Sequence, residues 1–291
     1  MNRSYTTYIN SEISVIIPTY YRASDLSELF ESILRQTINP VEVIVVDDTP
    51  NDTIKIVCEV YKSKYEKINT DIKYLRNPRE LGLTVARNVG IENASGGIIL
   101  FLDSDVILHQ EFIEKILEVF KDNSNALGVH GWVGKEKIKY NKIIYLIYEL
   151  LARIFHLYYH SKNSCKYPEY PCILTKIINC THMRGCNMAF KKDVFNEFRF
   201  DENLTKYCFN EDLLFSHSIF QKYPNSLFIT PYAKNIHKYS EAGRMEDKEL
   251  NKNKRISRKY VLTKLFGFKG LLIYYWQNIG LSIVRICKSF L

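Results

Sequence analysis

The chain has 291 residues and a formal net charge of +8, with 46% hydrophobic and 25% charged residues. This composition is that of a globular protein with a sizeable core, and it excludes a disordered or low-complexity chain. The mild positive charge suits anionic partners such as nucleotide phosphates or an acidic membrane surface, without selecting between them.

Cysteine usage and hydropathy bear on the cellular compartment. Seven cysteines are scattered without a CxxC pair or the spacing of a metal finger, which predicts reduced thiols in a cytosolic protein. The first apolar segment, residues 13–17, is too short for a signal peptide and lacks a cleavage site. No apolar run reaches about 18 residues, so no membrane-spanning helix is expected.

Apolar strands and amphipathic helices alternate through the first third of the chain. Residues 13–17 predict a strand that Pro18 ends, and the apolar spacing over 24–36 predicts a helix. Further strands are expected over three apolar segments, 41–48, 72–77 and 96–103. Further helices are expected over the segment ending near residue 67 and over 83–94. This order is typical of an open parallel sheet that binds ligands at the carboxyl ends of its strands.

The remainder is less regular. Residues 130–134 resemble a strand, 183–195 a strand followed by the start of a helix, and 210–223 a helix that opens with acids. Residues 141–160 predict a strongly apolar helix with one polar stripe. The chain ends with a basic run and a long apolar segment, 252–260 and 261–291.

Polar residues follow three of the predicted strands, at Pro18-Thr19, Asp47-Asp48 and Asp103-Ser104-Asp105. Two alternating carboxylates at the exit of a buried strand repel each other unless a cation lies between them. Hard oxygen ligands suit Mg²⁺ or Mn²⁺, which share their remaining positions with substrate phosphates. An isolated DxD is equally explained by acids that cap the next helix.

Several motifs occur together in a fixed order: SVIIPTYYR, VEVIVVDDTPNDT, GLTVARNVGI, FLDSDV, RGCNMAF and NEDLLFSHSI. The combination resembles the inverting family 2 glycosyltransferases over about residues 13–240. The resemblance implies an α/β protein with the GT-A fold and a mostly parallel central sheet. A catalytic domain over 1–240 would comprise a Rossmann-like nucleotide-binding half, about 10–107, and an acceptor half, about 108–240. Residues 241–291 would form a basic, amphipathic helical extension.

The resemblance assigns nucleotide binding to residues at the predicted strand ends and on the third helix. These are Pro18, Thr19, Tyr20, Asp48, Arg87, Asn88, Asp103 and Ser104. The first three would line the base pocket, and Asp48 would accept a hydrogen bond from the base. The alternative for Asp48 is a solvated turn, and Arg87 could equally belong to a structural ion pair.

The resemblance also implies a metal site and a donor-sugar segment. The expected ligands of Mn²⁺ or Mg²⁺ are Asp105, Asp103 and His237, although a lone histidine is more commonly structural. The segment that passes under the donor sugar would be Gly185, Cys186 and Asn187. A glycine there permits close approach of the backbone to a ligand.

Glu211 and Asp212 resemble the acidic pair that the family places beside the acceptor. An acceptor hydroxyl that attacks an anomeric carbon must lose its proton, and a nearby carboxylate can take it. Asp212 is the predicted general base and Glu211 an acceptor contact. The alternative is that both acids only stabilise a helix N-terminus.

The C-terminal segment is amphipathic. Its apolar residues recur at spacings of four and three: Leu272, Trp276, Ile279, Ile283, Ile286 and Phe290. With the basic run upstream, this pattern favours peripheral contact with a membrane interface. The alternative is a helix docked on the catalytic domain or on a second subunit.

The sequence therefore predicts a metal-assisted, inverting enzyme that moves a sugar from a nucleotide diphosphate sugar, with UDP the expected nucleotide. The expected acceptor is a hydroxyl of a glycan or lipid-linked glycan, at the cytoplasmic face of the membrane, and no nucleic-acid partner is expected. The alternative function is a catalytically silent scaffold that binds nucleotide sugars. A dinucleotide-dependent oxidoreductase is excluded because no GxGxxG follows the first strand.

Overall fold

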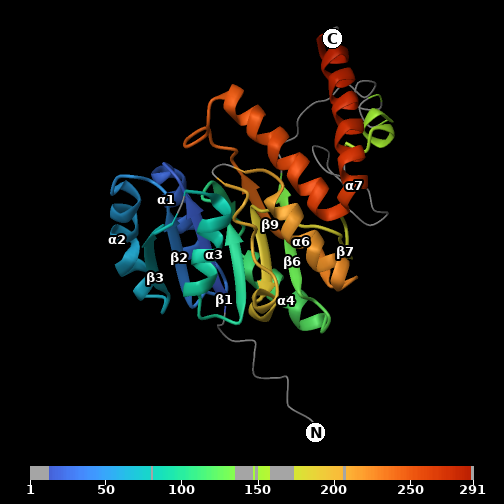
Figure 1. The fold of residues 1–291 in the computed structure, drawn as a ribbon. Coiled ribbons are helices and arrows are strands. Elements are labelled where there is room, and N and C mark those ends of the chain that lie inside the picture. The colour runs from blue at the N-terminus through green and yellow to red at the C-terminus, as the bar shows by residue number, and fades with distance from the viewer. Residues whose placement is uncertain are drawn as a thin grey trace.

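The structure, a computed structural model, describes residues 13–79, 81–134, 147, 150–157, 174–205 and 208–289. A central sheet carries helices on both faces, and a long C-terminal helix extends beyond it (Figure 1).

The first third of the chain alternates between strands and helices, as predicted. Its elements are β1 (Ile13–Thr19), α1 (Ala23–Leu34), β2 (Glu42–Asp47), α2 (Thr53–Glu66), β3 (Asp71–Arg76), α3 (Leu83–Asn93) and β4 (Ile98–Leu102). The prediction that Pro18 ends the first strand was wrong, because Pro18 lies opposite Val46 within the parallel register. Proline lacks only the N–H donor, and its fixed φ lies within the β region, so it is tolerated one residue before the strand ends.

The later elements include several that the sequence did not predict. They are β5 (Val106–Leu108), α4 (Phe112–Asp122), β6 (Gly128–Gly134), β7 (Ile178–Asn179), β8 (Asn187–Lys191), the 3₁₀ helix η2 (Lys192–Asn196), α6 (Glu211–Lys222), β9 (Leu227–His237) and α7 (Asp247–Ser289). The strands expected near 130–134 and within 183–195, and the helix over 210–223, are confirmed; β5, α4, β7 and β9 were missed. The helix expected over 141–160 lies mostly outside the described residues, and within them 150–154 are helical.

The nine strands of the described residues form one sheet in the order β3-β2-β1-β4-β8-β6-β9-β5, with β7 paired to β9. Strand β1 is parallel to β2 and β4, and β2 is parallel to β3. Strand β8 is antiparallel to both β4 and β6, and β6 is parallel to β9. Six strands (β1, β2, β3, β4, β6 and β9) therefore run in one direction, and their carboxyl ends open on one edge of a mostly parallel sheet.

The sheet is buried on both faces. Val15 and Ile17 of β1 pack in the core that includes residues of α1, α2 and α4, whereas Ile16 packs in the core that includes residues of α3 and α6. Burial on both faces explains why β1 and β2 have continuous apolar runs rather than an alternating pattern.

Helix α7 has two halves that meet at a kink. Gly267 at the kink has a φ of 58°, which is not helical. Val261 in the first half packs against Leu204 and Leu214. The second half lies beside residues 150–157 and extends away from the sheet (Figure 1). Among the described residues, no helix is both long and apolar enough to cross a bilayer.

Candidate active site

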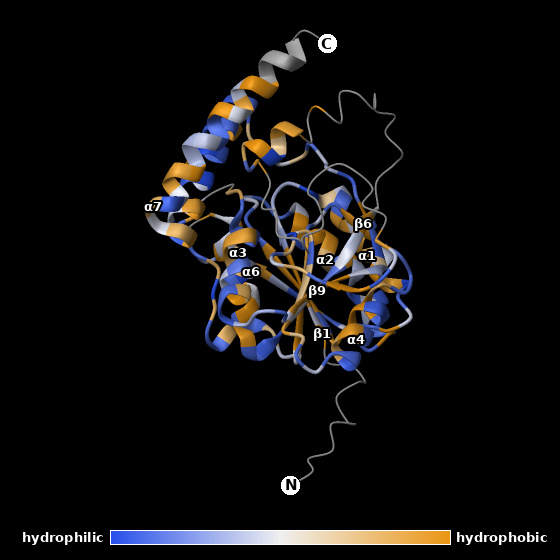
Figure 2. Ribbon diagram, turned by 90° about the vertical axis from the view of Figure 1, so that its right-hand side faces the viewer, coloured by the Kyte–Doolittle hydropathy of each residue, from blue (hydrophilic) through white to orange (hydrophobic). Residues whose placement is uncertain are grey.

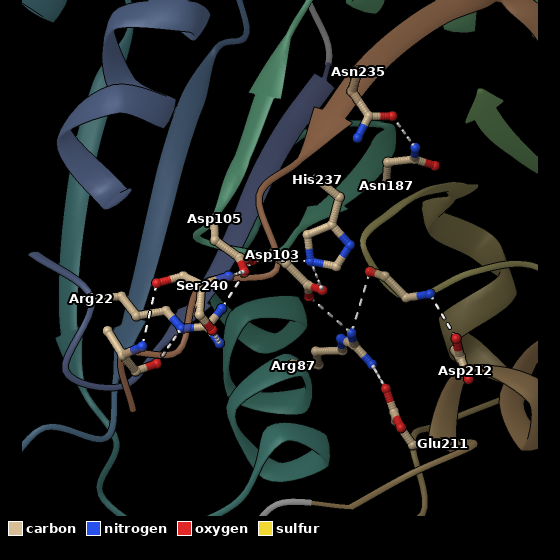
Figure 3. A network of polar contacts seen from close by, with 12 residues as sticks. Arg22, Arg87, Asp103, Asp105, Asn187, Glu211, Asp212, Asn235, His237 and Ser240 are labelled. Carbon is tan, nitrogen blue, oxygen red and sulfur yellow. Dashed lines mark hydrogen bonds and ion pairs between the residues drawn. The ribbon is translucent and has the colours of Figure 1, made fainter. Parts of the chain in front are cut away.

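Asp103, Asp105 and His237 meet at the carboxyl edge of the sheet (Figure 3). The two aspartates lie in the turn between β4 and β5, and the antiparallel pairing of β5 with β9 places Val106 opposite His237. His237 Nε2 lies 3.1 Å from Asp105 Oδ1 and 3.8 Å from Asp103 Oδ2. Strand β9, which the sequence did not predict, therefore brings the histidine to the acidic turn.

Asp105 is held by groups from three parts of the chain. Arg22 Nη1 lies 2.9 Å from Oδ1, and the Ser240 N–H donates to Oδ2 at 2.9 Å. Arg22 also donates to the carbonyl oxygens of Ser240 (3.3 Å) and Ala242 (2.9 Å), which fixes this loop beside the acidic turn. Burial would raise the pKa of Asp105, but the hydrogen bond and charge of His237 and the charge of Arg22 outweigh it and lower that pKa. Asp105 is therefore ionised at neutral pH.

Sequence reasoning missed the roles of Arg22 and Ser240. Arg22 closes the motif SVIIPTYYR, so its place near a predicted strand end was a usable signal. Ser240 contributes a backbone N–H, for which residue type gives no signal.

The charge of His237 depends on the same carboxylates. Burial favours the neutral imidazole, but the hydrogen bonds to Asp105 and to the Cys186 thiol, with the charge of Asp103, raise the pKa of His237 to about 10. Burial raises the pKa of Asp103, partly offset by the positive charges of Arg87 and His237. Because a metal ligand must be a neutral imidazole, a cation bound here would replace the proton on His237.

The three side chains fit a divalent cation. Their ligand atoms all lie within 4.8 Å of one another. Metal–ligand bonds of about 2.1 Å place two ligands of one ion about 3 Å apart when adjacent and about 4.2 Å apart when opposite. Both His237–aspartate distances, 3.1 and 3.8 Å, fall in this range. The two carboxylates supply the oxygen ligands that suit both Mn²⁺ and Mg²⁺.

Arg87 connects the acidic turn with the start of α6. This side chain on α3 is only 1% exposed, and its Nη1 lies 2.9 Å from Glu211 Oε1. Its Nη2 donates to the Gly185 carbonyl at 3.3 Å and lies 3.7 Å from Asp103 Oδ1. The structural ion pair left open by the sequence is therefore present, and nucleotide binding by Arg87 stays a prediction.

Glu211 and Asp212 occupy the first turn of α6 but have different environments (Figure 3). Asp212 is partly exposed, and its Oδ2 and Oδ1 accept the N–H groups of Gly185 (2.8 Å) and Leu213 (2.7 Å). Glu211 is 8% exposed and binds Arg87. Burial and the neighbouring Asp212 raise the pKa of Glu211 to about 7, although Arg87 opposes the shift. Asp212 is thus the carboxylate of the pair that solvent can reach.

The predicted donor-sugar segment lies between these two groups of acids. A Cβ on Gly185 would stand 2.7 Å from Arg87 Nη2 and 3.3 Å from Glu211 Oε1, so a side chain there would have to displace the Arg87 guanidinium. The Cys186 carbonyl accepts the Asp103 N–H at 3.2 Å. Burial raises the pKa of the Cys186 thiol, so the thiol is protonated at neutral pH.

Asn187 is fully buried and bonds inward to Gly131 and Asn235. Its side chain therefore has internal partners, and contact with a donor sugar stays a prediction.

The predicted base pocket lies at the ends of β1 and β2. Asp48 accepts hydrogen bonds from Asn77 Nδ2 (2.7 Å) and the Gly82 N–H (3.1 Å), and burial raises its pKa. Thr19 Oγ1 is buried without a hydrogen-bond partner in the described part of the chain. Pro18 precedes it in β1, and Tyr20 is 41% exposed.

Two other predicted nucleotide-binding residues are buried. Ser104 is 2% exposed. Asn88 hydrogen-bonds to the backbone of Phe200 and to the side chain of Glu202, so it fastens the loop that contains these two residues to α3. Contact of either residue with a nucleotide stays a prediction.

An α/β sheet whose carboxyl edge brings an Asp-Ser-Asp turn to a histidine defines a GT-A type protein with a candidate metal site. The family model described as "Glycosyl transferase family 2" matches residues 14–199, and the chain belongs to this family.

The similar proteins agree with this assignment. The chain is 27% identical to the minor teichoic acid biosynthesis protein GgaB of Bacillus subtilis, over 67% of this chain and 20% of GgaB. It is 34% identical to a dolichol-phosphate mannosyltransferase of Pyrococcus furiosus, over 45% of this chain and 35% of that protein. The chain therefore spans much less than the full length of these relatives.

The fold resembles a solved structure. The crystal structure of S. aureus TarS matches 87% of this chain and 39% of TarS, with a TM-score of 0.53 and 20% sequence identity. At this identity the likeness supports the fold.

Proposed function

We propose that the chain is an inverting glycosyltransferase that moves a sugar from a nucleotide diphosphate sugar to an acceptor hydroxyl. A UDP-sugar is the expected donor. One observation carries the proposal: the segment Gly185–Cys186 connects a candidate metal cluster to a solvent-accessible carboxylate. The Cys186 carbonyl binds the Asp103 N–H, and the Gly185 N–H binds Asp212. A donor whose diphosphate lies at the metal cluster, and whose sugar lies over Gly185–Cys186, would present its anomeric carbon towards Asp212.

In this proposal Asp212 is the general base. The acceptor oxygen bonds to the anomeric carbon while its proton passes to Asp212 and the bond from that carbon to the diphosphate oxygen breaks. The electron pair leaves with the nucleoside diphosphate. A divalent cation held by Asp105, Asp103 and His237 would stabilise the negative charge that develops there.

The environment of Glu211 supports single displacement. A double displacement needs a second carboxylate as nucleophile near the anomeric carbon. Glu211 is buried and bound to Arg87, which leaves Asp212 as the accessible member of the pair. One base and no covalent intermediate give a product with inverted configuration.

The acceptor class follows from the relatives rather than from the geometry. The names of two relatives refer to teichoic acid biosynthesis and to dolichol-phosphate. They support a glycan or lipid-linked glycan as acceptor, and with it a place at the cytoplasmic face of the membrane.

A screen of nucleotide sugars with Mn²⁺ or Mg²⁺ tests the proposal by thermal shift and by product analysis. A donor at ~100 times its Kd stabilises the fold by about 2.7 kcal/mol, which raises the Tm of a 291-residue chain by about 4 °C. Asp105→Asn should lose the metal-dependent part of this shift, whereas Glu118→Gln, an exposed acid on α4, should keep it. Circular dichroism checks the fold, and Asp103→Asn provides a second variant. Full transfer in EDTA, or no turnover with any donor that binds, would contradict the proposal.

A further inference from the structure

The excess positive charge of the chain resides in one helix. Helix α7 contains ten lysine and arginine residues and two acids, an excess of eight. This excess equals the net charge of all 291 residues, so the rest of the chain is neutral in sum. Both acids, Asp247 and Glu249, lie in the first turn, and residues 250–291 contain none. Helix α7 is thus a cationic element attached to a neutral body.

The second half of α7 exposes its apolar side. The exposed fractions there are 74% for Phe268, 55% for Leu272, 53% for Tyr275, 43% for Trp276 and 51% for Ile279. Spacings of three and four place these side chains on one face of the helix, and Figure 2 shows apolar residues recurring along it. By contrast, the polar Gln277 is 5% exposed and bonds to the His156 carbonyl. A helix that only packed on its own domain would have the opposite orientation.

Residues 150–157 extend this face and hold it in place. Trp276 Nε1 donates to the Ile154 carbonyl at 2.8 Å, and the Trp276 and Phe155 rings lie 4.9 Å apart. Leu150 and Ile154 are 58% and 47% exposed. We call the exposed set the apolar ridge: Leu150, Ile154, Phe268, Leu272, Tyr275, Trp276 and Ile279. A cluster of this kind marks an interaction surface rather than the scattered apolar residues of an ordinary protein surface.

The charges around the apolar ridge indicate which kind of partner binds to it. Lys269 is exposed next to Phe268, and Lys252, Arg255 and Lys259 are exposed on the first half of the helix. A second copy of the chain docked through this face would bring two cationic helices together, which like-charge repulsion opposes. An anionic lipid surface instead attracts the lysines and arginines and accepts the apolar residues, with tyrosine and tryptophan suited to its interface.

We propose that the apolar ridge and the cationic side chains of α7 bind an anionic lipid bilayer, with the ridge inserted at the boundary of headgroups and acyl chains. The first half of α7 packs on α6 through Val261 and Leu214, and Asp212 lies in the first turn of α6. Binding would therefore bring the bilayer to the side of the molecule that carries Asp212. This last point rests on the proposed function, whereas lipid binding itself does not.

Co-sedimentation of the full chain with vesicles tests the proposal. Vesicles of phosphatidylcholine, with and without phosphatidylglycerol, should retain the protein only when the anionic lipid is present, and high salt should release it. Replacing Leu272 and Ile279 by serine should reduce partitioning by at least about tenfold. The matched control replaces Ile56 and Val60, exposed by 55% and 62% on α2, and should bind as the wild type.

A second pair of variants tests the charges. The triple variant Lys252→Glu, Arg255→Glu, Lys259→Glu should lose the dependence on phosphatidylglycerol. The control variant Lys62→Glu, Lys67→Glu, at exposed positions on and beside α2, should keep it.

Fluorescence tests insertion of the ridge. The chain has two tryptophans among 21 tyrosines, so Trp132→Phe leaves Trp276 as the sole tryptophan, which is excited selectively at a wavelength that tyrosine does not absorb. Lipids with brominated acyl chains should quench it, because the proposal places the indole at the acyl boundary.

The outcomes separate this proposal from the proposed function. A chain that ignores anionic vesicles at low salt, or a ridge variant that binds like its control, overturns the lipid proposal even if sugar transfer is intact. A dimer in light scattering that the ridge variant loses would assign the surface to a second copy instead. Vesicle binding without any sugar transfer would contradict the proposed function alone.

Discussion

Replacing Asp212 by asparagine removes a proton acceptor from the first turn of α6 while the side chain keeps its size. Both carboxylate oxygens accept backbone N–H groups, from Gly185 at 2.8 Å and Leu213 at 2.7 Å. An amide has one oxygen, so one of these N–H groups would face an NH₂ group. An unmet backbone donor costs about 1–3 kcal/mol, and partial exposure of the site favours the lower end.

The kinetic effect should exceed this loss of stability. A general base contributes about 10²–10⁴-fold to a rate, so transfer by Asp212→Asn should fall by about 10²-fold or more. Donor affinity should stay near wild type, because the proposed diphosphate site lies at Asp103 and Asp105. Transfer rate, donor-induced thermal shift and Tm are measured together. Asp193→Asn, an exposed acid in the first turn of η2, is the control.

Two results would refute this reasoning. If the Asp212→Asn variant transfers sugar at the wild-type rate, Asp212 is not the general base. A product that retains the donor's anomeric configuration would require a double displacement, and the environment of Glu211 would then need another explanation.

Three further predictions follow from Glu211, Gly185 and Glu42. The pKa of Glu211 is raised from 4.5 to about 7, so the folded state holds an extra proton between these values. Stability should then fall by up to about 3 kcal/mol as pH rises through this window, and urea unfolding of Glu211→Gln should lack this decrease. Gly185→Ala places a Cβ 2.7 Å from Arg87 Nη2. The resulting shift of this segment should displace Asp212, which accepts the Gly185 N–H. Transfer should fall by about 10²-fold, with an unchanged circular dichroism spectrum. Burial would raise the pKa of Glu42, but hydrogen bonds from Lys73 and two serines lower it to about 2. This stabilisation is present above pH 4.5 and lost as pH falls through 2, so Glu42→Gln should cost about 2–3 kcal/mol at neutral pH, measured by urea unfolding.

The parallel half of the fold was predictable because its signals are local. Residues 42–47 of β2 are all buried, so the apolar run in the sequence reports the strand directly. The polar residues that end such runs, among them Asp48 and Asp103, then fall at the carboxyl edge by topology alone. Residues 112–122 also had a helical apolar pattern that could have been used to predict α4.

Strand β9 was harder to recognise. It is continuously buried from 227 to 231 and alternates from Tyr232 onwards, and Pro231 lies at the change. Neither a buried-strand pattern nor a half-exposed pattern covers its whole length, so no single periodicity predicts it.

The contacts that organise the site join residues far apart in the chain. Arg87 and Glu211 are separated by 124 positions, and only the packing of α3 beside α6 makes them partners. A single sequence gives the identity of each charged residue, but which opposite charge it meets is decided by tertiary structure. The ion pair of Arg22 with Asp105 belongs to the same class.

The direction of the second half of α7 depends on the backbone conformation of one residue at the kink. Gly267 has a φ of 58° and a ψ of −135°, a combination in which residues with side chains are strained. No described atom lies within 4 Å of where a Cβ would stand, so packing at this point does not force the bend. A side chain at 267 would favour a straighter helix, which would carry Trp276 away from Ile154. The backbone conformation of Gly267, together with the contacts of Trp276 and Gln277 with Ile154 and His156, therefore sets the direction in which the second half of α7 leaves the rest of the molecule.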